Sequence, residues 1–127
     1  MIAPLPGDCF YFDPDRQANV HLWVVLTVYA SDHIDDSLAI IVSITSMKPG
    51  ADRACVLRSD DGDAHGFVKH ESYAYYERCR EVEAVELLRR REDRRSPVAP
   101  TLLARLRDGL HKSPFAPRWA KSRVPRQ

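Results

Sequence analysis

The chain has 127 residues, of which 44% are hydrophobic and 29% are charged. This length corresponds to one ordinary domain that can bury a core without disulfide bonds or metal ions. No apolar run approaches the roughly 18 residues that a membrane-spanning helix needs, and the first residues lack the pattern of a secretory signal. We therefore expect a soluble, cytoplasmic protein with one domain over residues 1–112 and a basic, proline-containing tail over residues 113–127.

The charge is divided along the chain, although the formal net charge is only +1. Residues 1–77 carry five Lys/Arg and twelve Asp/Glu, a sum of −7, and residues 78–127 carry fourteen and six, a sum of +8. This division favours either a nucleic-acid surface or two faces that attract each other within the fold or across a dimer.

The three cysteines, Cys9, Cys55 and Cys79, are odd in number and include no C-x-x-C pair. This pattern indicates neither a disulfide framework nor a zinc site, so we expect small apolar core residues and no metal or cofactor.

The first predicted elements are strands. Gly7-Asp8 is a turn before an aromatic strand at 9–12, which Asp13-Pro14-Asp15 ends. The runs 20–29 and 37–46 are rich in β-branched and apolar residues, and a short acidic turn joins them. They predict an antiparallel hairpin of two central strands.

Shorter elements follow the hairpin. They are a strand at 54–57, strand-like stretches within 65–76, a strand at 79–82, a helix at 84–91, a linker at 92–100 and an amphipathic helix at 102–110. The acidic turn at 59–63 lacks the closing glutamate of an EF-hand. From Ser113 onward, three prolines and basic residues predict a poorly ordered or partner-bound arm. The whole pattern predicts a mainly β (α+β) fold, a small antiparallel barrel with one or two C-terminal helices.

A family resemblance rests on five features in order. Gly7-Asp8, an aromatic strand, a polar loop and then strands like His21–Thr27 and one ending Ile44-Thr45-Ser46 resemble the MazF/PemK (Kid-like) toxins of bacterial toxin–antitoxin systems. Residues 72–83 resemble that family's closing strand pair. The resemblance covers residues 7 to about 110 and implies an SH3-like barrel, a homodimer and a metal-independent, sequence-selective endoribonuclease that a cognate antitoxin neutralises.

The resemblance also identifies site residues. The family's catalytic threonine falls on Thr45, whereas its catalytic arginine position holds His21, followed by Leu22 in place of the usual proline. This departure leaves two alternatives, loss of the reaction or replacement of the arginine by a histidine. His21 opens one long strand and Thr45 closes the other, so the hairpin would bring both to one rim of the sheet.

The chemistry of metal-free RNA cleavage extends this set. It needs a base for the 2′-hydroxyl, an acid for the leaving 5′-oxygen and positive charge for the phosphorane, and imidazoles serve both proton transfers. His21 and His70 are the candidate imidazoles, Lys69 is a candidate phosphate contact, and Thr45 is a candidate hydroxyl donor to a non-bridging oxygen.

Further residues are candidates for substrate binding. Tyr75 and Tyr76 are neighbours in a strand-like stretch, so they point to opposite faces, and the exposed one is available for base stacking. Trp23 lies in an apolar strand and is expected in the core. Arg53 follows the Pro49-Gly50 turn and is expected near the rim that carries Thr45.

Three classes of function stay open at the sequence level. They are an endoribonuclease toxin acting on single-stranded RNA, a non-catalytic relative that binds a protein as CcdB-like gyrase poisons do, and a nucleic-acid-binding regulator that uses the basic C-terminal third. The match at Thr45 favours the first class, the missing arginine favours the second, and the charge division favours the third.

Overall fold

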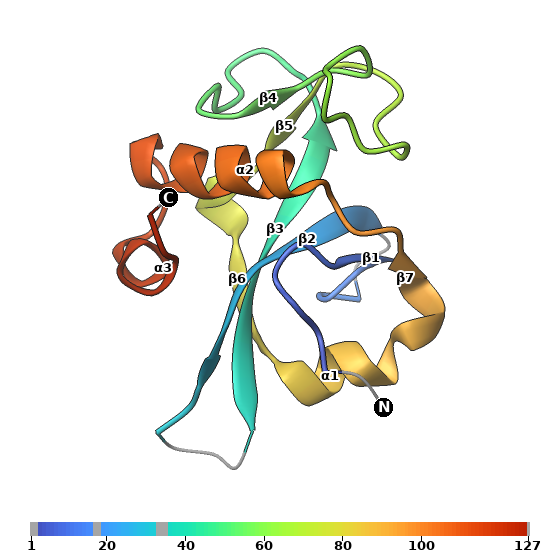
Figure 1. Ribbon diagram of the computed structural model, residues 1–127. Helices are drawn as coiled ribbons and strands as arrows, with labels where there is room; N and C mark the ends of the chain where they lie inside the picture. Colours follow the sequence, from blue (N-terminus) through green and yellow to red (C-terminus); the bar gives the residue numbers. More distant parts are fainter. Residues whose placement is uncertain (1–2, 17–18, 33–35, 127) are drawn as a thin grey trace.

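The computed structural model describes residues 3–16, 19–32 and 36–126. Its strands are β1 (Cys9–Phe12), β2 (His21–Ala30), β3 (Ser37–Ser46), β4 (Val56–Leu57), β5 (Ser72–Ala74), β6 (Arg80–Glu83) and β7 (Arg94–Arg95). Its helices are α1 (Ala84–Arg89), α2 (Pro100–Lys112) and α3 (Arg118–Arg123), with 3₁₀ turns η1 (Tyr76–Arg78) and η2 (Arg91–Asp93). The strands of the described residues form one antiparallel sheet in the order β4-β5-β3-β2-β1-β7, and β6 pairs with β3 (Figure 1). The predicted mainly β (α+β) class is confirmed.

The long hairpin of β2 and β3 is the centre of the sheet. Its register runs from Leu22 opposite Ile44 to Ala30 opposite Ser37, as the two apolar runs predicted. The register shifts between Val25 and Thr27, which marks a β-bulge that bends the strand. Residues 33–35 of the connecting acidic turn lie outside the described residues.

Both faces of the hairpin are covered, which explains why its strands are apolar almost throughout. Leu22, Val24 and Leu26 belong to the core cluster that also contains the buried leucines of α2. Trp23 and Val25 alternate with them and belong to a second cluster, which includes Leu87 of α1. Figure 1 shows α2 lying across the sheet, with α1 at a different end of the molecule.

Helix α2 begins at Pro100, a residue that suits the first helical position, and it buries one stripe of side chains. Leu102, Leu106 and Leu110 are spaced by four residues and are at most 1% exposed. The hydroxyl of the buried Tyr76 donates to the carbonyl oxygen of Leu106 at 2.7 Å. This contact ties α2 to the segment that follows β5.

The C-terminal segment differs from the poorly ordered arm predicted from its prolines and charges. Residues 118–123 form α3, which lies beside α2 in Figure 1. Ala120 and Val124, four residues apart, are buried in the main core cluster. The guanidinium of Arg123 stacks over the ring of Tyr29, 4.9 Å from its centroid. The expectation was wrong because the segment buries Ala120 and Val124 and also makes hydrogen bonds to the end of α2, from Lys121 to the Ser113 carbonyl and between His111 and the Val124 carbonyl.

The predicted linker at 92–100 also contains structure. Its residues Arg94 and Arg95 form β7, which pairs with Phe10 and Cys9 of β1. The guanidinium of Arg94 donates to the carboxylate of Asp8 at 2.6 Å and lies 5.8 Å from the ring centroid of Phe10. These contacts form across more than 80 residues, so the local charge pattern could not reveal them.

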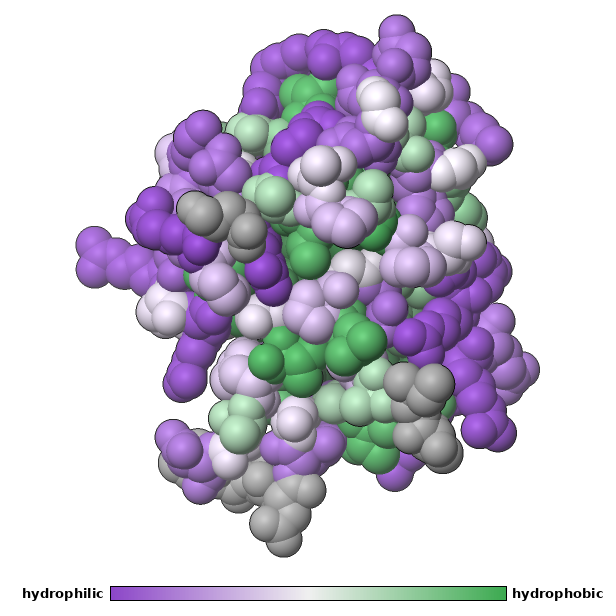
Figure 2. Space-filling model, viewed as in Figure 1, coloured by the Kyte–Doolittle hydropathy of each residue, from purple (hydrophilic) through white to green (hydrophobic). Residues whose placement is uncertain are grey.

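The surface is largely polar over the connecting segments. Figure 2 shows hydrophilic residues gathered over the loops around β4 and β5 and over the charged segment from α1 to β7, with apolar residues between them. Within the described residues, no helix is both long and apolar enough to cross a membrane.

Candidate functional site

The open end of the hairpin forms the first part of the candidate site. Leu22 pairs with Ile44, so His21 at the start of β2 and Thr45 near the end of β3 are the next residues at the same rim. Both line a cleft of about 340 Å³, the rim cleft. The side chains of His21 and Thr45 are half-buried, so the sheet holds them while leaving them accessible.

The loop between β4 and β5 supplies the other wall of the rim cleft. Val68 from this loop is buried, whereas Lys69 and His70 are exposed at the cleft. The structure therefore brings together four of the predicted site residues, His21, Thr45, Lys69 and His70. They come from two strands and one loop.

His70 is held by a contact with the end of β3. Its Nε2 lies 2.7 Å from the hydroxyl oxygen of Ser46. Its Nδ1 makes no hydrogen bond to the part of the chain that the structure describes. The ring is therefore oriented through one nitrogen while the other stays available for proton transfer.

Thr45 and Lys69 supply the remaining polar groups. The Thr45 hydroxyl lies 3.5 Å from that of the buried Ser43, two residues earlier on the same face of β3. The Lys69 ammonium makes no ion pair with any described residue, so its charge is available to an anionic ligand. A hydroxyl and a free ammonium beside two imidazoles suit a phosphate group.

Tyr75 and Arg53, the other predicted substrate-binding residues, do not line the rim cleft. Tyr75 is half-buried and lines a neighbouring cleft that shares His21, while Tyr76, the first residue of η1, is fully buried. Arg53 is exposed, and its guanidinium contacts the Met47 sulfur at 3.7 Å. Met47 directly follows β3, so this contact places Arg53 near the end of that strand, outside the residues that line the rim cleft.

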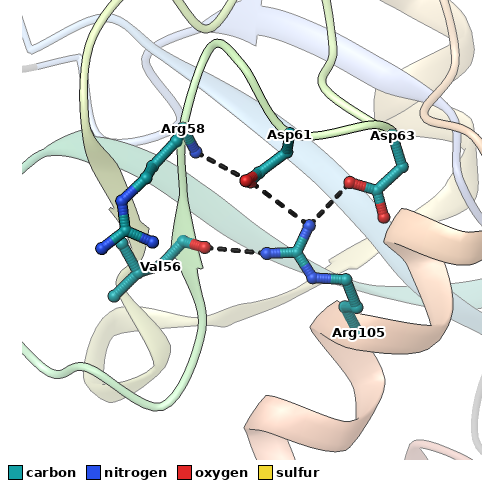
Figure 3. Close-up of polar contacts among 5 residues, drawn as sticks. All are labelled: Val56, Arg58, Asp61, Asp63 and Arg105. Carbon is teal, nitrogen blue, oxygen red and sulfur yellow. Dashed lines mark hydrogen bonds and ion pairs between the residues drawn. The ribbon is translucent and has the colours of Figure 1, made fainter.

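An arginine that sequence reasoning missed anchors the cleft loop. Arg105 of α2 donates to the carboxylates of Asp63 at 2.7 Å and Asp61 at 3.4 Å and to the carbonyl oxygen of Val56 at 2.8 Å (Figure 3). Asp61 also accepts from the backbone N–H of Arg58 at 3.0 Å. The acidic turn therefore binds an internal guanidinium. Its partner lies more than 40 residues away, so no local signal pointed to it.

Two further contacts fix the same loop. The backbone N–H of Phe67 donates to Nδ1 of His65 at 3.0 Å, so the proton of that imidazole is on Nε2, which donates to the Ser96 carbonyl at 2.6 Å. Arg58 forms an ion pair with Glu71 at 3.1 Å, at the end of the loop. Together with Arg105, these contacts position Lys69 and His70 at the rim.

The cysteines take no part in this site. Cys9, Cys55 and Cys79 are free and buried, as the sequence predicted. Burial raises the pKa of the Cys9 and Cys79 thiols to about 12 and also raises that of Cys55. They are therefore protonated, poorly nucleophilic core residues at neutral pH. Within the described residues, no three His, Cys, Asp or Glu side chains are grouped as metal ligands.

The chain was also compared with known proteins. No protein-family model and no curated protein matches it.

Proposed function

We propose that this protein is a metal-independent endoribonuclease that cleaves single-stranded RNA. The observation that carries the proposal is the convergence of His21, Thr45, Lys69 and His70 on one cleft. Two imidazoles, a hydroxyl and an ammonium are the groups that phosphodiester cleavage needs when protein side chains alone serve it.

The reaction is an internal transesterification. The 2′-oxygen forms a bond to the adjacent phosphorus while the bond from phosphorus to the 5′-oxygen of the next nucleotide breaks. Of His21 and His70, one imidazole takes the proton of the 2′-hydroxyl and the other donates a proton to the leaving 5′-oxygen. The Lys69 ammonium and the Thr45 hydroxyl stabilise the negative charge on the non-bridging oxygens. The products are a 2′,3′-cyclic phosphate and a 5′-hydroxyl end.

His21 occupies the position of the catalytic arginine in the toxins that the chain resembles. An imidazole there supplies proton transfer, while the positive charge that an arginine would add comes from Lys69 across the cleft. This division of roles supports an active enzyme despite the departure from the family pattern.

The same proposal includes partners and cellular place. A toxin-like enzyme of this kind acts on RNA in the cytoplasm, forms a homodimer and is neutralised by an antitoxin protein. Residues 78–127 carry fourteen Lys/Arg and six Asp/Glu, and this excess of positive charge favours binding of an acidic antitoxin segment. Sedimentation at low and high salt tests the dimer. A monomer at every concentration would show that the homodimer proposal is wrong, and it would not affect the proposed cleavage.

The direct test is incubation of the purified protein with a long single-stranded RNA in EDTA. We expect discrete fragments with cyclic phosphate and 5′-hydroxyl ends. Lys69→Ala should slow cleavage, whereas Lys112→Ala, which removes an exposed lysine paired with Asp108 on α2, should not. RNA that is bound but left intact would contradict the proposal and favour a nucleic-acid-binding regulator.

A further inference from the structure

A second cleft, of about 300 Å³, adjoins the rim cleft and shares His21 with it. It includes residues of the loop after β1, of the sheet and of the segment from Tyr75 to β6. We name it the arginine cleft after two of its residues. The residues that matter here are Asp15, His21, Ser43, Tyr75, Arg78 and Arg80.

The two arginines of this cleft differ in their partners. Arg80 is paired with the carboxylate of Asp15 through one of its oxygens. The exposed guanidinium of Arg78 has neither a hydrogen bond nor an ion pair to any side chain or carbonyl within the described residues. Among the residues that the structure describes, the arginine cleft therefore presents one guanidinium without a partner, and it keeps one carboxylate oxygen of Asp15 that Arg80 does not use.

An aromatic ring completes the arginine cleft. Tyr75 is half-buried beside Arg78, and the ammonium of Lys48 lies 5.2 Å from its ring centroid. A half-exposed tyrosine ring at the wall of a cleft offers a surface on which an unpaired base stacks.

We infer that the arginine cleft binds a guanine base next to the phosphate that the rim cleft cleaves. This inference rests on the proposed ribonuclease function, because His21 belongs to both clefts and would place the phosphate between them. A nucleotide with its base beside Tyr75 and Arg78 would present its phosphodiester at His21.

Guanine is the base whose edges match these groups. Its O6 and N7 are adjacent acceptors that take both N–H groups of one guanidinium, the role open to Arg78. Its N1–H is a donor for the carboxylate oxygen of Asp15 that Arg80 does not use. Adenine places an amino donor where guanine has O6, and cytosine also presents an amino donor, so both oppose a guanidinium at that point.

The test uses non-cleavable 2′-O-methyl pentanucleotides of uridine with guanosine, adenosine, cytidine or uridine at the centre. We expect the guanosine probe to bind about tenfold more tightly than the others, the discrimination typical of one bidentate arginine contact. Arg78→Ala should abolish this preference while leaving the uridine probe's affinity within about twofold. Arg118→Ala, which removes an exposed arginine of α3, should retain it.

Equal binding of the four probes, or a guanosine preference that survives in Arg78→Ala, would overturn the inference. The readout separates it from the proposed function. If the protein cleaves RNA but binds all four probes equally, the proposed function stands and the guanine subsite is wrong. If it prefers the guanosine probe but does not cleave RNA, the guanine subsite stands and the proposed function is wrong.

Discussion

The hydroxyl oxygen of Ser46 lies 2.7 Å from Nε2 of His70 and joins the end of β3 to the loop that carries Lys69. Twenty-four residues separate the two partners. The strand that places Thr45 at the rim therefore also orients the imidazole opposite it. This relationship makes Ser46 a positioning residue for the proposed reaction.

Replacing Ser46 by alanine tests that role. Loss of one hydrogen bond, worth about 1 kcal/mol, should lower the cleavage rate by about fivefold because His70 gains freedom to rotate. Ser46→Thr keeps the hydroxyl and should restore most of the rate. The measurements are single-turnover rates and melting temperatures. Equal rates in Ser46→Ala and the unaltered protein would show that the contact does not orient His70 for the reaction.

Arg105 is expected to hold the cleft loop from outside the cleft. Arg105→Met removes its contacts with Asp61, Asp63 and Val56 and should raise amide hydrogen exchange over residues 59–69. It should also lower cleavage several-fold, although its half-exposed ion pairs contribute only about 1 kcal/mol each to stability. Arg89→Met is the matched control because Arg89 pairs with Glu86 on an exposed helix surface. Unchanged exchange in the loop would rule out the anchoring role.

Gly109 of α2 is expected to tolerate no side chain. A Cβ there would lie 2.9 Å from Cβ of Cys55 and still closer to the hydroxyl of Tyr76. Gly109→Ala should therefore destabilise the protein by about 1–3 kcal/mol, despite the better helix propensity of alanine. Urea unfolding measures the change.

The same site offers a control for this prediction. Tyr76→Phe removes the hydroxyl that bonds to Leu106, which should cost about 1 kcal/mol by itself. Because it also removes the closest clash, Gly109→Ala should cost less in the Tyr76→Phe background. Strictly additive losses would contradict the crowding that the structure shows.

The buried thiols predict a loss of stability at alkaline pH. Burial raises the pKa of Cys9 and Cys79 from 9.0 to about 12, so between these values the unfolded chain ionises while the folded one does not. The stabilising effect is complete below pH 9 and falls by about 1.4 kcal/mol per pH unit for each thiol as the pH rises toward 12.

Urea unfolding of the unaltered protein and of Cys79→Ala at several alkaline pH values measures this effect. The alanine variant should show a slope that is smaller by the contribution of one thiol. Identical slopes for the two proteins would mean that the Cys79 thiol does not titrate as its burial requires.

The central fold and part of the site could be predicted from the sequence because they depend on local patterns. The apolar runs around Val24 and Val42 define the hairpin, and the positions of His21 and Thr45 at its strand ends place both at one rim. The sequence also predicted that Tyr75 and Tyr76 differ in exposure, although both lie beyond the end of β5 and Tyr76 begins η1 rather than continuing a strand.

The missed features depend on contacts between distant residues. Arg105 meets Asp63 across 42 residues, and Arg94 meets Asp8 across 86. The charge pattern of a sequence shows that acidic and basic residues are present, but it does not show which of them form ion pairs in the fold. The sequence did not predict that α3 is a packed helix, because Ala120 and Val124 are small residues among basic ones. Their burial depends on contacts with α2 and the sheet, which the local sequence does not reveal.

The most direct measurement is the single-turnover rate of RNA cleavage in EDTA by His21→Ala, together with its RNA affinity and melting temperature. Loss of one general acid or base typically lowers the rate about 10²- to 10⁴-fold. The account predicts a loss of that size, with affinity changed only slightly and the fold intact. An unaltered rate in His21→Ala, with a change confined to the melting temperature, would contradict the account and leave His21 a structural residue at the start of β2.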